Sequence, residues 1–465
     1  MGNAEGAPDR IADIQKLSRR ELEALQWARL RETIERVMAQ SPFYQQLYRK
    51  QHLKLDKITS RDAFCEMVPM IDKKMLLADQ EAAPPFGTRL LTPEQEIMHT
   101  CMTSGTTGLG QEVHPFSFAD MAVLAESWGT MFRWRGLVPG DRIYLFWPVA
   151  VQIAGLSMAY AMQEFKASCF FGATLDTERK LRTMQRFPPH GIITVPAYLT
   201  RLTVLCQEMG IEPRRDFPTL KMIDASTQAF STGWVREMEE FWGVPLAELY
   251  GSSQSAPGVM FSGRGDVLRA DGSRGLLCAM EHTLYFEVLD RGTGKPVRSG
   301  EEGELVITNF RRTTPLIRFR MEDRVTYYDH THCRQGYPFA GLQCGTIARY
   351  DDMMKIKGQN VWPEAIDEVV FSFSPVSEYN GRVYIDAKGR EVAAISFELK
   401  RAARLNEEDL EALTERMGEK LRSHLGVSFH LQIAPHGTVE RFTFKARRWT
   451  DERRTGRQVE KYLAT

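Results

Sequence analysis

The stretch RIYLFWPVAVQIAGLSMAYAMQEF, residues 142–165, joins two kinds of apolar segment. Residues 142–147 form a short run of branched and aromatic side chains, as in strands that are buried on both faces. The segment from about Val151 to Phe165 is long enough for a buried helix. Positions 143–162 have no charged side chain and approach the length that spans a bilayer. Because Pro148 separates the two segments, we interpret the stretch as an interior βα unit.

The same alternation continues on both sides of this unit, from about residue 96 to residue 250. Further strands are predicted at residues 167–172, 191–195 and 220–224, and helices at residues 197–209 and 232–242. Strands that alternate with helices predict a mostly parallel sheet with helices on its faces. Before this region, a helical segment over residues 18–50 begins with the capping-box pair Ser18 and Glu21.

The pattern changes after residue 276. Strands at residues 285–289 and 303–308, with glycine-containing turns around them, predict an antiparallel portion. Residues 350–465 predict an α+β unit with strands near 353–356, 382–386 and 392–398 and a charged helix over 406–425. The predicted fold class is therefore α/β. A large N-terminal domain, residues 1–350, has mixed, largely parallel sheets and an antiparallel portion, and a small C-terminal α+β domain spans residues 351–465.

Composition limits the class of protein. The chain has 465 residues, which is too long for one compact core. Its 60 basic and 60 acidic residues balance, so nothing predicts a nucleic-acid or membrane partner. The seven cysteines form no paired framework, and residues 1–10 have no apolar signal sequence. We expect a cytoplasmic protein with free thiols.

The sharpest local motif is Thr103-Ser104-Gly105-Thr106-Thr107-Gly108. Glycines let backbone amides approach an anion, and hydroxyl groups add hydrogen-bond donors, so the motif suits a polyphosphate. It is not a Walker A loop, because Gln111 and Glu112 stand where that loop has its lysine and its Ser or Thr. A polar turn without a ligand is the alternative interpretation.

With this motif the sequence resembles the adenylate-forming superfamily, which includes acyl-CoA synthetases, nonribosomal adenylation domains and luciferases. Within it, the chain is most similar to phenylacetate-CoA ligase-like aryl-CoA ligases. Residues 17–26 and Ser41-Pro-Phe-Tyr44 resemble the opening helix of that branch. The resemblance covers nearly the whole chain and implies that the C-terminal domain is a mobile lid.

The resemblance also implies an ATP- and AMP-binding site, which draws on four segments. The residues that it places there are Thr103, Ser104, Gly105, Thr106, Thr107, Gly108, Tyr250, Gly251, Ser252, Asp323 and Arg349. A carboxylate such as Asp323 suits the ribose hydroxyls because it offers two acceptor oxygens.

Three segments depart from the family pattern. Gln254 stands where the family has a glutamate that binds Mg²⁺; an amide oxygen can bind the ion but adds no charge. Ser226-Thr-Gln-Ala229 replaces a Gly-Glu-Pro stretch that contacts adenine. Met321-Glu322 replaces the Thr-Gly pair before Asp323.

The C-terminal motifs imply the remaining roles. Asp351 resembles the hinge between the two domains, and Gly358 the point where the thiol arm of CoA passes the backbone. Lys445, in Arg441-Phe-Thr-Phe-Lys445, matches the catalytic lysine of the family. An acid pocket is predicted along residues 147–158 and 250–258.

The implied activity is ATP-dependent activation of a small, aromatic carboxylic acid as acyl-AMP, followed by transfer to the thiol of CoA. ATP, Mg²⁺ and CoA are the implied cofactors, and a homodimer is a family-level expectation. Three alternatives stay open: transfer to a carrier-protein thiol or an amine, activation of another oxyanion such as nitrite for attack by an aryl amine, and a non-catalytic nucleotide-binding module. A zinc site at His330, His332, Cys333 and Cys344 is not predicted, because the ligand spacing is incomplete.

Overall fold

The computed structural model describes residues 14–103, 111–149, 153–172, 175–401, 403–442 and 447–453. The chain forms two compact units, which we describe separately. The first comprises Met1–Thr194, Arg214–Ser226 and Val244–Ile347, and the second comprises Val195–Pro213, Thr227–Gly243 and Ala348–Thr465. The domain boundary proposed from the sequence, at residue 350, stays a prediction.

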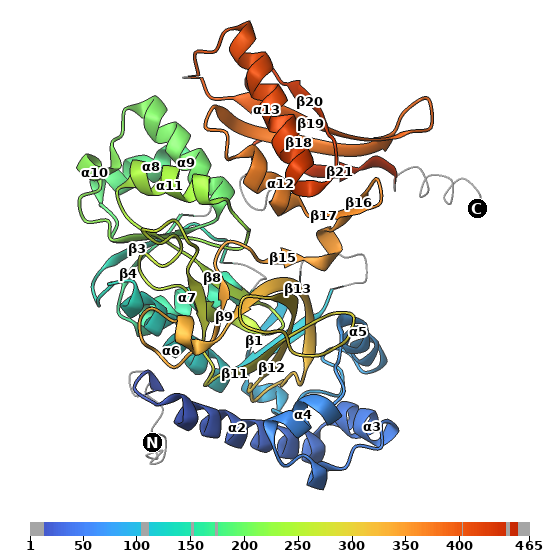
Figure 1. Cartoon of the computed structure of the whole chain (residues 1–465). Helices are drawn as coiled ribbons and strands as arrows, with labels where there is room; N and C mark the ends of the chain where they lie inside the picture. Colours follow the sequence, from blue (N-terminus) through green and yellow to red (C-terminus); the bar gives the residue numbers. More distant parts are fainter. Residues whose placement is uncertain are drawn as a thin grey trace. The chain divides into compact units, whose positions relative to one another are not determined.

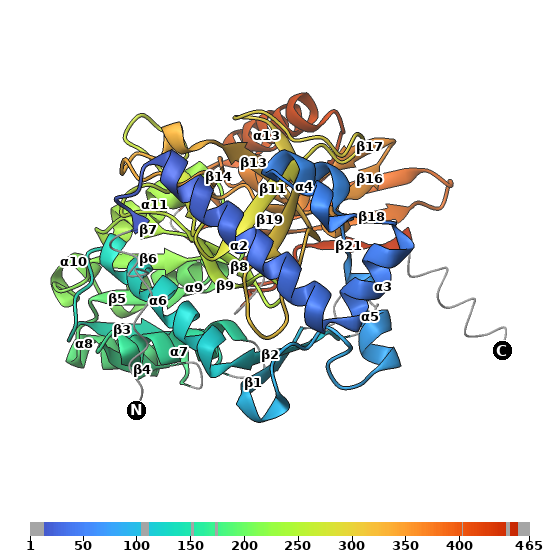
Figure 2. The same cartoon turned by 90° about the horizontal axis from the view of Figure 1, so that it is seen from below.

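The first unit opens with two helices, α2 (Arg19–Gln40) and α3 (Pro42–Lys50). At the start of α2, Ser18 and Glu21 form the predicted capping box, each side chain accepting a hydrogen bond from the other's backbone N–H. Ser41 ends α2 and caps α3, whose first residue is Pro42, because proline suits the first turn of a helix. Figure 2 shows α2 (blue) running along the antiparallel sheet, and it contacts β11.

A five-stranded sheet forms the first layer of this unit. Its order is β4-β3-β5-β6-β7 and all four pairings are parallel. The strands are β3 (Arg142–Leu145), β4 (Ser168–Phe171), β5 (Gly191–Thr194), β6 (Met222–Ala225) and β7 (Leu246–Ala247). All residues of β5 and β6 are buried, as expected of a parallel sheet with covered faces. The strands predicted from the apolar runs are confirmed.

Helices α6 (Phe118–Trp134), α7 (Ile153–Glu164) and α8 (Thr177–Arg186) belong to the same unit. Helices α6 and α7 pack together beside β3 and β4 (Figure 1). Most of α7 is buried, which confirms the interior βα unit predicted from residues 142–165. Among the described residues, none of the helices combines the length and the apolar character that crossing a bilayer requires.

The second sheet of the unit is antiparallel, in the order β11-β12-β13-β14-β10-β9-β8. The predicted strands at 285–289 and 303–308 are β11 (Leu284–Leu289) and β12 (Glu302–Asn309), so the antiparallel portion is confirmed. The other strands are β8 (Leu249–Ser252), β9 (Ala256–Phe261), β10 (Leu276–Ala279), β13 (Phe319–Tyr328) and β14 (Gly341–Gln343).

The second unit contains an α+β portion. Its sheet has the order β20-β19-β18-β21, with β18 (Val376–Ile385) and β19 (Glu391–Leu399) antiparallel at the centre. Strands β20 (His430–Ile433) and β21 (Trp449–Asp451) pair parallel at the edges. Helices α12 (Pro363–Val370) and α13 (Glu407–Leu425) bury Ile366, Leu413 and Met417 in one apolar cluster with the sheet. The predicted strands and the long helix are confirmed.

The remaining elements are short or connect these layers. They are η1 (Leu55–Lys57), α4 (Arg61–Met67), α5 (Lys73–Ala82), η2 (Glu94–Glu96), α9 (Pro196–Met209), α10 (Pro213–Asp216), α11 (Thr232–Trp242), η3 (His330–His332), β15 (Ala348–Arg349) and η4 (Tyr350–Asp352). The predicted α/β class is confirmed.

Candidate nucleotide site

The predicted phosphate motif lies at the end of a hairpin. Strands β1 (Ile97–Met102) and β2 (Val113–Ser117) pair antiparallel. Just beyond them the Thr103 N–H donates to the Glu112 carbonyl at 3.0 Å, and the Glu112 N–H donates to Thr103 Oγ1 at 3.0 Å. These two bonds close the base of the connecting segment. Residues 104–108 lie outside the described residues, so their phosphate-binding role stays a prediction.

Glu112 is the centre of a buried polar cluster that sequence analysis missed. Its side chain is 1% exposed, and its Oε2 accepts a hydrogen bond from Gln254 Nε2 at 2.6 Å. Lys73 Nζ lies 3.7 Å from Oε2, and His114 Nε2 lies 3.8 Å from Oε1. The signal was present in the sequence, since an acidic residue directly precedes the apolar strand β2.

Burial sets the electrostatics of this cluster. It raises the pKa of Glu112, while the Lys73 ammonium acts in the opposite direction. It also holds the pKa of His114 well below its usual range, and the nearby guanidiniums of Arg89 and Arg311 add to that shift. His114 is therefore neutral at pH 7. Within the described residues, Glu112 Oε1 and His114 Nε2 have no hydrogen-bond partner.

Gln254 lies in a tight turn between β8 and β9. The Ser252 and Ser255 side chains each accept a hydrogen bond from the other residue's backbone N–H, at 2.9 and 3.2 Å. Asn309 Nδ2 donates to the Gln254 carbonyl at 3.2 Å. The Ser252–Ser255 bonds and the bond from Asn309 therefore fix the turn, and the Gln254 side chain extends from it to Glu112.

Two predicted nucleoside-binding residues meet in the structure. The Tyr250 hydroxyl, on β8, donates to Asp323 Oδ2, on β13, at 2.6 Å. Both residues are buried, at 9% and 6% exposure. A short bond to a carboxylate is a strong one, and it orients the carboxylate. Gly251 and Ser252 follow Tyr250 on the same strand. Their roles in nucleotide binding stay predictions.

Two departures from the family pattern occupy left-handed backbone positions. Glu322, directly before Asp323, has φ +57°, and Thr227 has φ +81°. A left-handed φ is unusual for residues other than glycine. It costs the most conformational energy in β-branched residues. Both residues therefore occupy conformations that glycine adopts with least strain.

The predicted hinge and channel residues belong to the second unit. Arg349 Nη2 lies 3.0 Å from Asp351 Oδ2, and Asp351 is part of the short helix η4. Lys357 and Gly358 join β16 (Met354–Ile356) to β17 (Gln359–Val361). Both residues have positive φ, as the two-residue turns of hairpins require. No described atom lies within 4 Å of a Cβ placed on Gly358, so the backbone is open there.

Lys445 lies outside the described residues, and its catalytic role stays a prediction. The chain on either side is anchored in the second unit. Arg441 pairs with Glu398, and Arg448 Nε lies 2.7 Å from Glu378 Oε1. Together with strand β21, these contacts attach the segment that contains Lys445 to the central strands β18 and β19.

The two segments predicted to form the acid pocket meet around Trp128, which sequence analysis also missed. Trp128 Nε1 donates to Ser157 Oγ, on α7, at 3.2 Å. On β9, a Cβ added to Gly258 would lie 2.7 Å from the Trp128 ring, so only glycine fits there. The acid-binding role of these segments stays a prediction.

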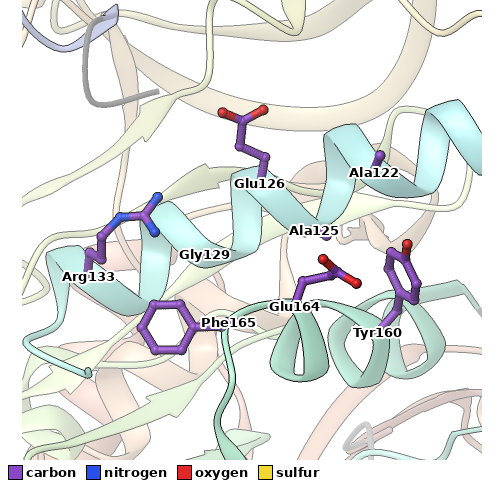
Figure 3. Close-up of a pocket in the computed structure, with 8 residues that line it drawn as sticks. All are labelled: Ala122, Ala125, Glu126, Gly129, Arg133, Tyr160, Glu164 and Phe165. Atoms are coloured by element: carbon purple, nitrogen blue, oxygen red, sulfur yellow. The ribbon is translucent and has the colours of Figure 1, made fainter. Parts of the chain in front are cut away.

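A separate pocket of about 230 Å³ opens between α6 and α7 (Figure 3). Gly129 and Arg133 contribute to it from α6, and Tyr160 and Glu164 from α7. Its volume is below the roughly 300–1,000 Å³ of ordinary ligand sites. None of the predicted nucleotide-site residues lines it, so we do not assign the site there.

Cys333 and Cys344, two of the four residues considered for a zinc site, make separate contacts. Cys278 Sγ lies 3.3 Å from Cys333 Sγ, and Cys344 Sγ contacts the Asp266 carbonyl instead. Among the residues that the structure describes, no three His, Cys, Asp or Glu side chains could hold a metal ion together.

Known proteins match the chain over most of its length. A phenylacetate-coenzyme A ligase from Aromatoleum evansii is 25% identical over 454 residues, covering 96% of this chain and 98% of the relative. One from Thermus thermophilus is 27% identical over 447 residues, covering 92% and 96%. The crystal structure of a 2-hydroxyisobutyryl-CoA ligase with 2-HIB-AMP superposes with a TM-score of 0.83 at 22% identity, covering 96% of this chain and 93% of that one.

Two family models divide the chain between them. The model described as AMP-binding enzyme matches residues 25–310, and the model described as AMP-binding enzyme C-terminal domain matches residues 358–453. The first match alone covers more than half of the 465 residues. The chain belongs to the family of AMP-binding enzymes.

Proposed function

We propose that the protein is an ATP-dependent, AMP-forming ligase, which activates a small carboxylic acid as acyl-AMP and transfers the acyl group to coenzyme A. The observation that supports this most is the coverage: both family models match, and the phenylacetate-coenzyme A ligases are covered over 96–98% of their own length. The whole architecture that such relatives use is therefore present in one chain.

In this proposal the nucleoside is held by the antiparallel sheet. Asp323 accepts hydrogen bonds from the ribose hydroxyls, and the Tyr250 hydroxyl fixes the carboxylate at 2.6 Å. The segment whose base is closed by Thr103 and Glu112 binds the phosphates through amide and hydroxyl donors. Arg349 adds a charged contact to the nucleotide.

The family pairs the nucleotide with Mg²⁺, which neutralises phosphate charge when it is bound. The described residues fit such an ion. Glu112 Oε1 is a buried carboxylate oxygen without a hydrogen-bond partner among them, and Gln254 supplies a neutral amide beside it. Carboxylate and amide oxygens are the ligands that Mg²⁺ accepts, together with phosphate oxygens and water.

Lys445 is the proposed catalytic residue. Its ammonium bridges the acid carboxylate and the α-phosphate as negative charge develops in adenylation. A contact of this kind at about 4 Å, with an effective dielectric constant near 20, is worth roughly 4 kcal/mol. If the contact is made only in the transition state, the rate rises about a thousandfold. Rotation of the C-terminal part about Asp351 then withdraws the lysine and admits the thiol past Gly358.

For the acid we propose an aromatic carboxylate, following the named relatives, and for the acceptor coenzyme A. The acid lies between the segments that meet at Trp128. The buried Trp128 indole packs against Gly258 and so holds the two segments together.

The test is acid-dependent ATP–pyrophosphate exchange by the purified chain with substituted benzoates, phenylacetates and cinnamates. Exchange with any of them, followed by a CoA thioester when CoA is added, is the expected result. Exchange without a thioester would replace CoA by a carrier-protein thiol or an amine. No exchange, with ATP binding intact, would contradict acid activation and favour another oxyanion, such as nitrite, or a nucleotide-binding module.

A further inference from the structure

Glu112 and Gln254 form a carboxylate–amide pair at the base of the phosphate segment. The Gln254 amide nitrogen donates to Glu112 Oε2 at 2.6 Å, which leaves the second carboxylate oxygen, Oε1, buried and without a partner in the described chain. Glu112 is also bonded to Thr103, the first residue of the motif: its carbonyl accepts from the Thr103 N–H, and its N–H donates to Thr103 Oγ1, both at 3.0 Å. The carboxylate therefore belongs to the phosphate end of the site.

A buried negative charge at this place has to be explained. A carboxylate beside a polyphosphate repels it, unless a cation lies between the two. Lys73 is the nearest described cation to Glu112 Oε2, and its Nζ lies 3.7 Å away, beyond hydrogen-bond distance. His114 Nε2 lies 3.8 Å from Oε1, also beyond hydrogen-bond distance. Oε1 therefore lacks a cationic partner within the described residues.

We infer that Glu112 provides the carboxylate of the Mg²⁺ site, and that Gln254 holds this carboxylate in place through its amide. This inference rests on the proposed function. It accounts for the glutamine at position 254, because the negative charge that the family has there is supplied by the residue directly before β2. In this chain a carboxylate and an amide then together replace the single glutamate that binds Mg²⁺ in the family pattern.

Nucleotide binding, measured with and without a divalent cation, tests whether Glu112 is a metal ligand. The full chain is titrated, without any acid, with the α,β-methylene analogue of ATP, whose α–β bridge an AMP-forming ligase cannot cleave, in EDTA and in Mn²⁺. Bound Mn²⁺ is followed by its EPR signal. For Glu112→Gln we expect Mn²⁺ to bind at least about tenfold more weakly in the presence of nucleotide, since even partners of metal ligands have effects of that size. Binding in EDTA should stay equal or become tighter, because a repulsive charge is gone.

The exchanged pair E112Q/Q254E is the second variant. It keeps one carboxylate and one amide, so Mn²⁺ affinity should return to within a few-fold of the wild type. Glu96→Gln, an exposed position before β1, is the matched control and should change neither titration.

Each outcome decides between the alternatives. If Glu112→Gln folds and binds Mn²⁺ as the wild type does, Glu112 is not a ligand and the inference is wrong. If Glu112→Gln does not fold, Gln254→Glu decides: added negative charge should tighten Mn²⁺ binding and weaken binding in EDTA, and no change in either would overturn the inference. A wild-type chain that binds no nucleotide under any condition would instead contradict the proposed function.

Discussion

At the scale of single residues, the proposed catalytic lysine can be tested through the two half-reactions. Lys445→Ala should lower adenylation about a thousandfold, because the charge contact with the α-phosphate is lost. Thioester formation from preformed acyl-AMP should change much less. Arg447→Ala, at an exposed position of the same segment, is the control. An equal loss in both half-reactions would show that Lys445 has another role.

Glu322 offers a test of backbone strain. Its φ of +57° is left-handed, where a side chain costs about 1–2 kcal/mol relative to glycine. The flexibility of glycine in the unfolded chain offsets part of this. Glu322→Gly should therefore raise the free energy of unfolding by up to about 1 kcal/mol, measured by urea denaturation.

Glu302→Gly is the control for that substitution. Glu302 begins β12 and pairs with Arg324, as the partly buried Glu322 pairs with Arg291, but glycine in a strand lowers stability. The two variants should change the free energy of unfolding in opposite directions. If Glu322→Gly were as destabilising as Glu302→Gly, the left-handed backbone at position 322 would not be a source of strain.

A buried carboxyl gives the stability of the first unit a pH dependence. Burial raises the pKa of Glu248 to about 8, with only partial compensation from the Gly345 N–H, which donates to it at 2.7 Å. The folded chain thus holds a proton that the unfolded chain releases near the usual glutamate pKa. This contribution to stability is complete below that pKa and is lost as the pH rises to about 8.

Glu248→Gln removes this ionisation and keeps the size of the side chain. Relative to the wild type, its free energy of unfolding should rise steadily between about pH 5 and pH 8, the range set by the raised pKa. Urea denaturation at four pH values measures it, with the exposed Glu96→Gln as control. A constant difference across the range would mean that Glu248 is ionised throughout.

At the scale of secondary-structure elements, the hairpin β16–β17 provides a test of the thiol channel. Gly358 has φ +84°, and the position that a Cβ would take there is open, so Gly358→Ala causes backbone strain without a described clash. If the thiol arm passes here, the added methyl should slow thioester formation and leave pyrophosphate exchange unchanged.

Gly389→Ala is the matched variant. Gly389 lies in the turn between β18 and β19, has φ +75°, and is equally open among the described atoms. It should have the same small cost in stability and no effect on either half-reaction. Identical kinetics for the two variants would remove Gly358 from the channel.

Element boundaries could be predicted from the sequence where local chemistry sets them. The capping box at Ser18 and Glu21 starts α2, and Pro363 starts α12, as expected from helix-end preferences. Apolar runs without a polar face located β3 and β5, because such runs have to be buried on both sides. These features depend on neighbours in the sequence, which is why they could be predicted.

At the scale of the whole molecule, the proposed hinge can be tested by restricting one bond. Proline at position 351 fixes φ, so Asp351→Pro should retain one half-reaction and suppress the other by at least about tenfold if the C-terminal part rotates there. Asp351→Ala loses the same 3.0 Å ion pair with Arg349 but keeps φ free, and should support both half-reactions. Two variants with the same kinetics would place the hinge elsewhere.

By itself, the sequence determined the α/β class, the order of the elements and the membership in the family of AMP-binding enzymes, since all three depend on local patterns and ordered motifs. Only the tertiary structure brought Tyr250 to Asp323, Trp128 between Ser157 and Gly258, and Glu112 to Gln254. These pairs lie 29 to 142 positions apart in the chain, and only the pairing and packing of strands and helices sets their distances. For that reason the carboxylate at position 112, four positions after the end of the motif in the sequence, could be related to position 254 only after folding.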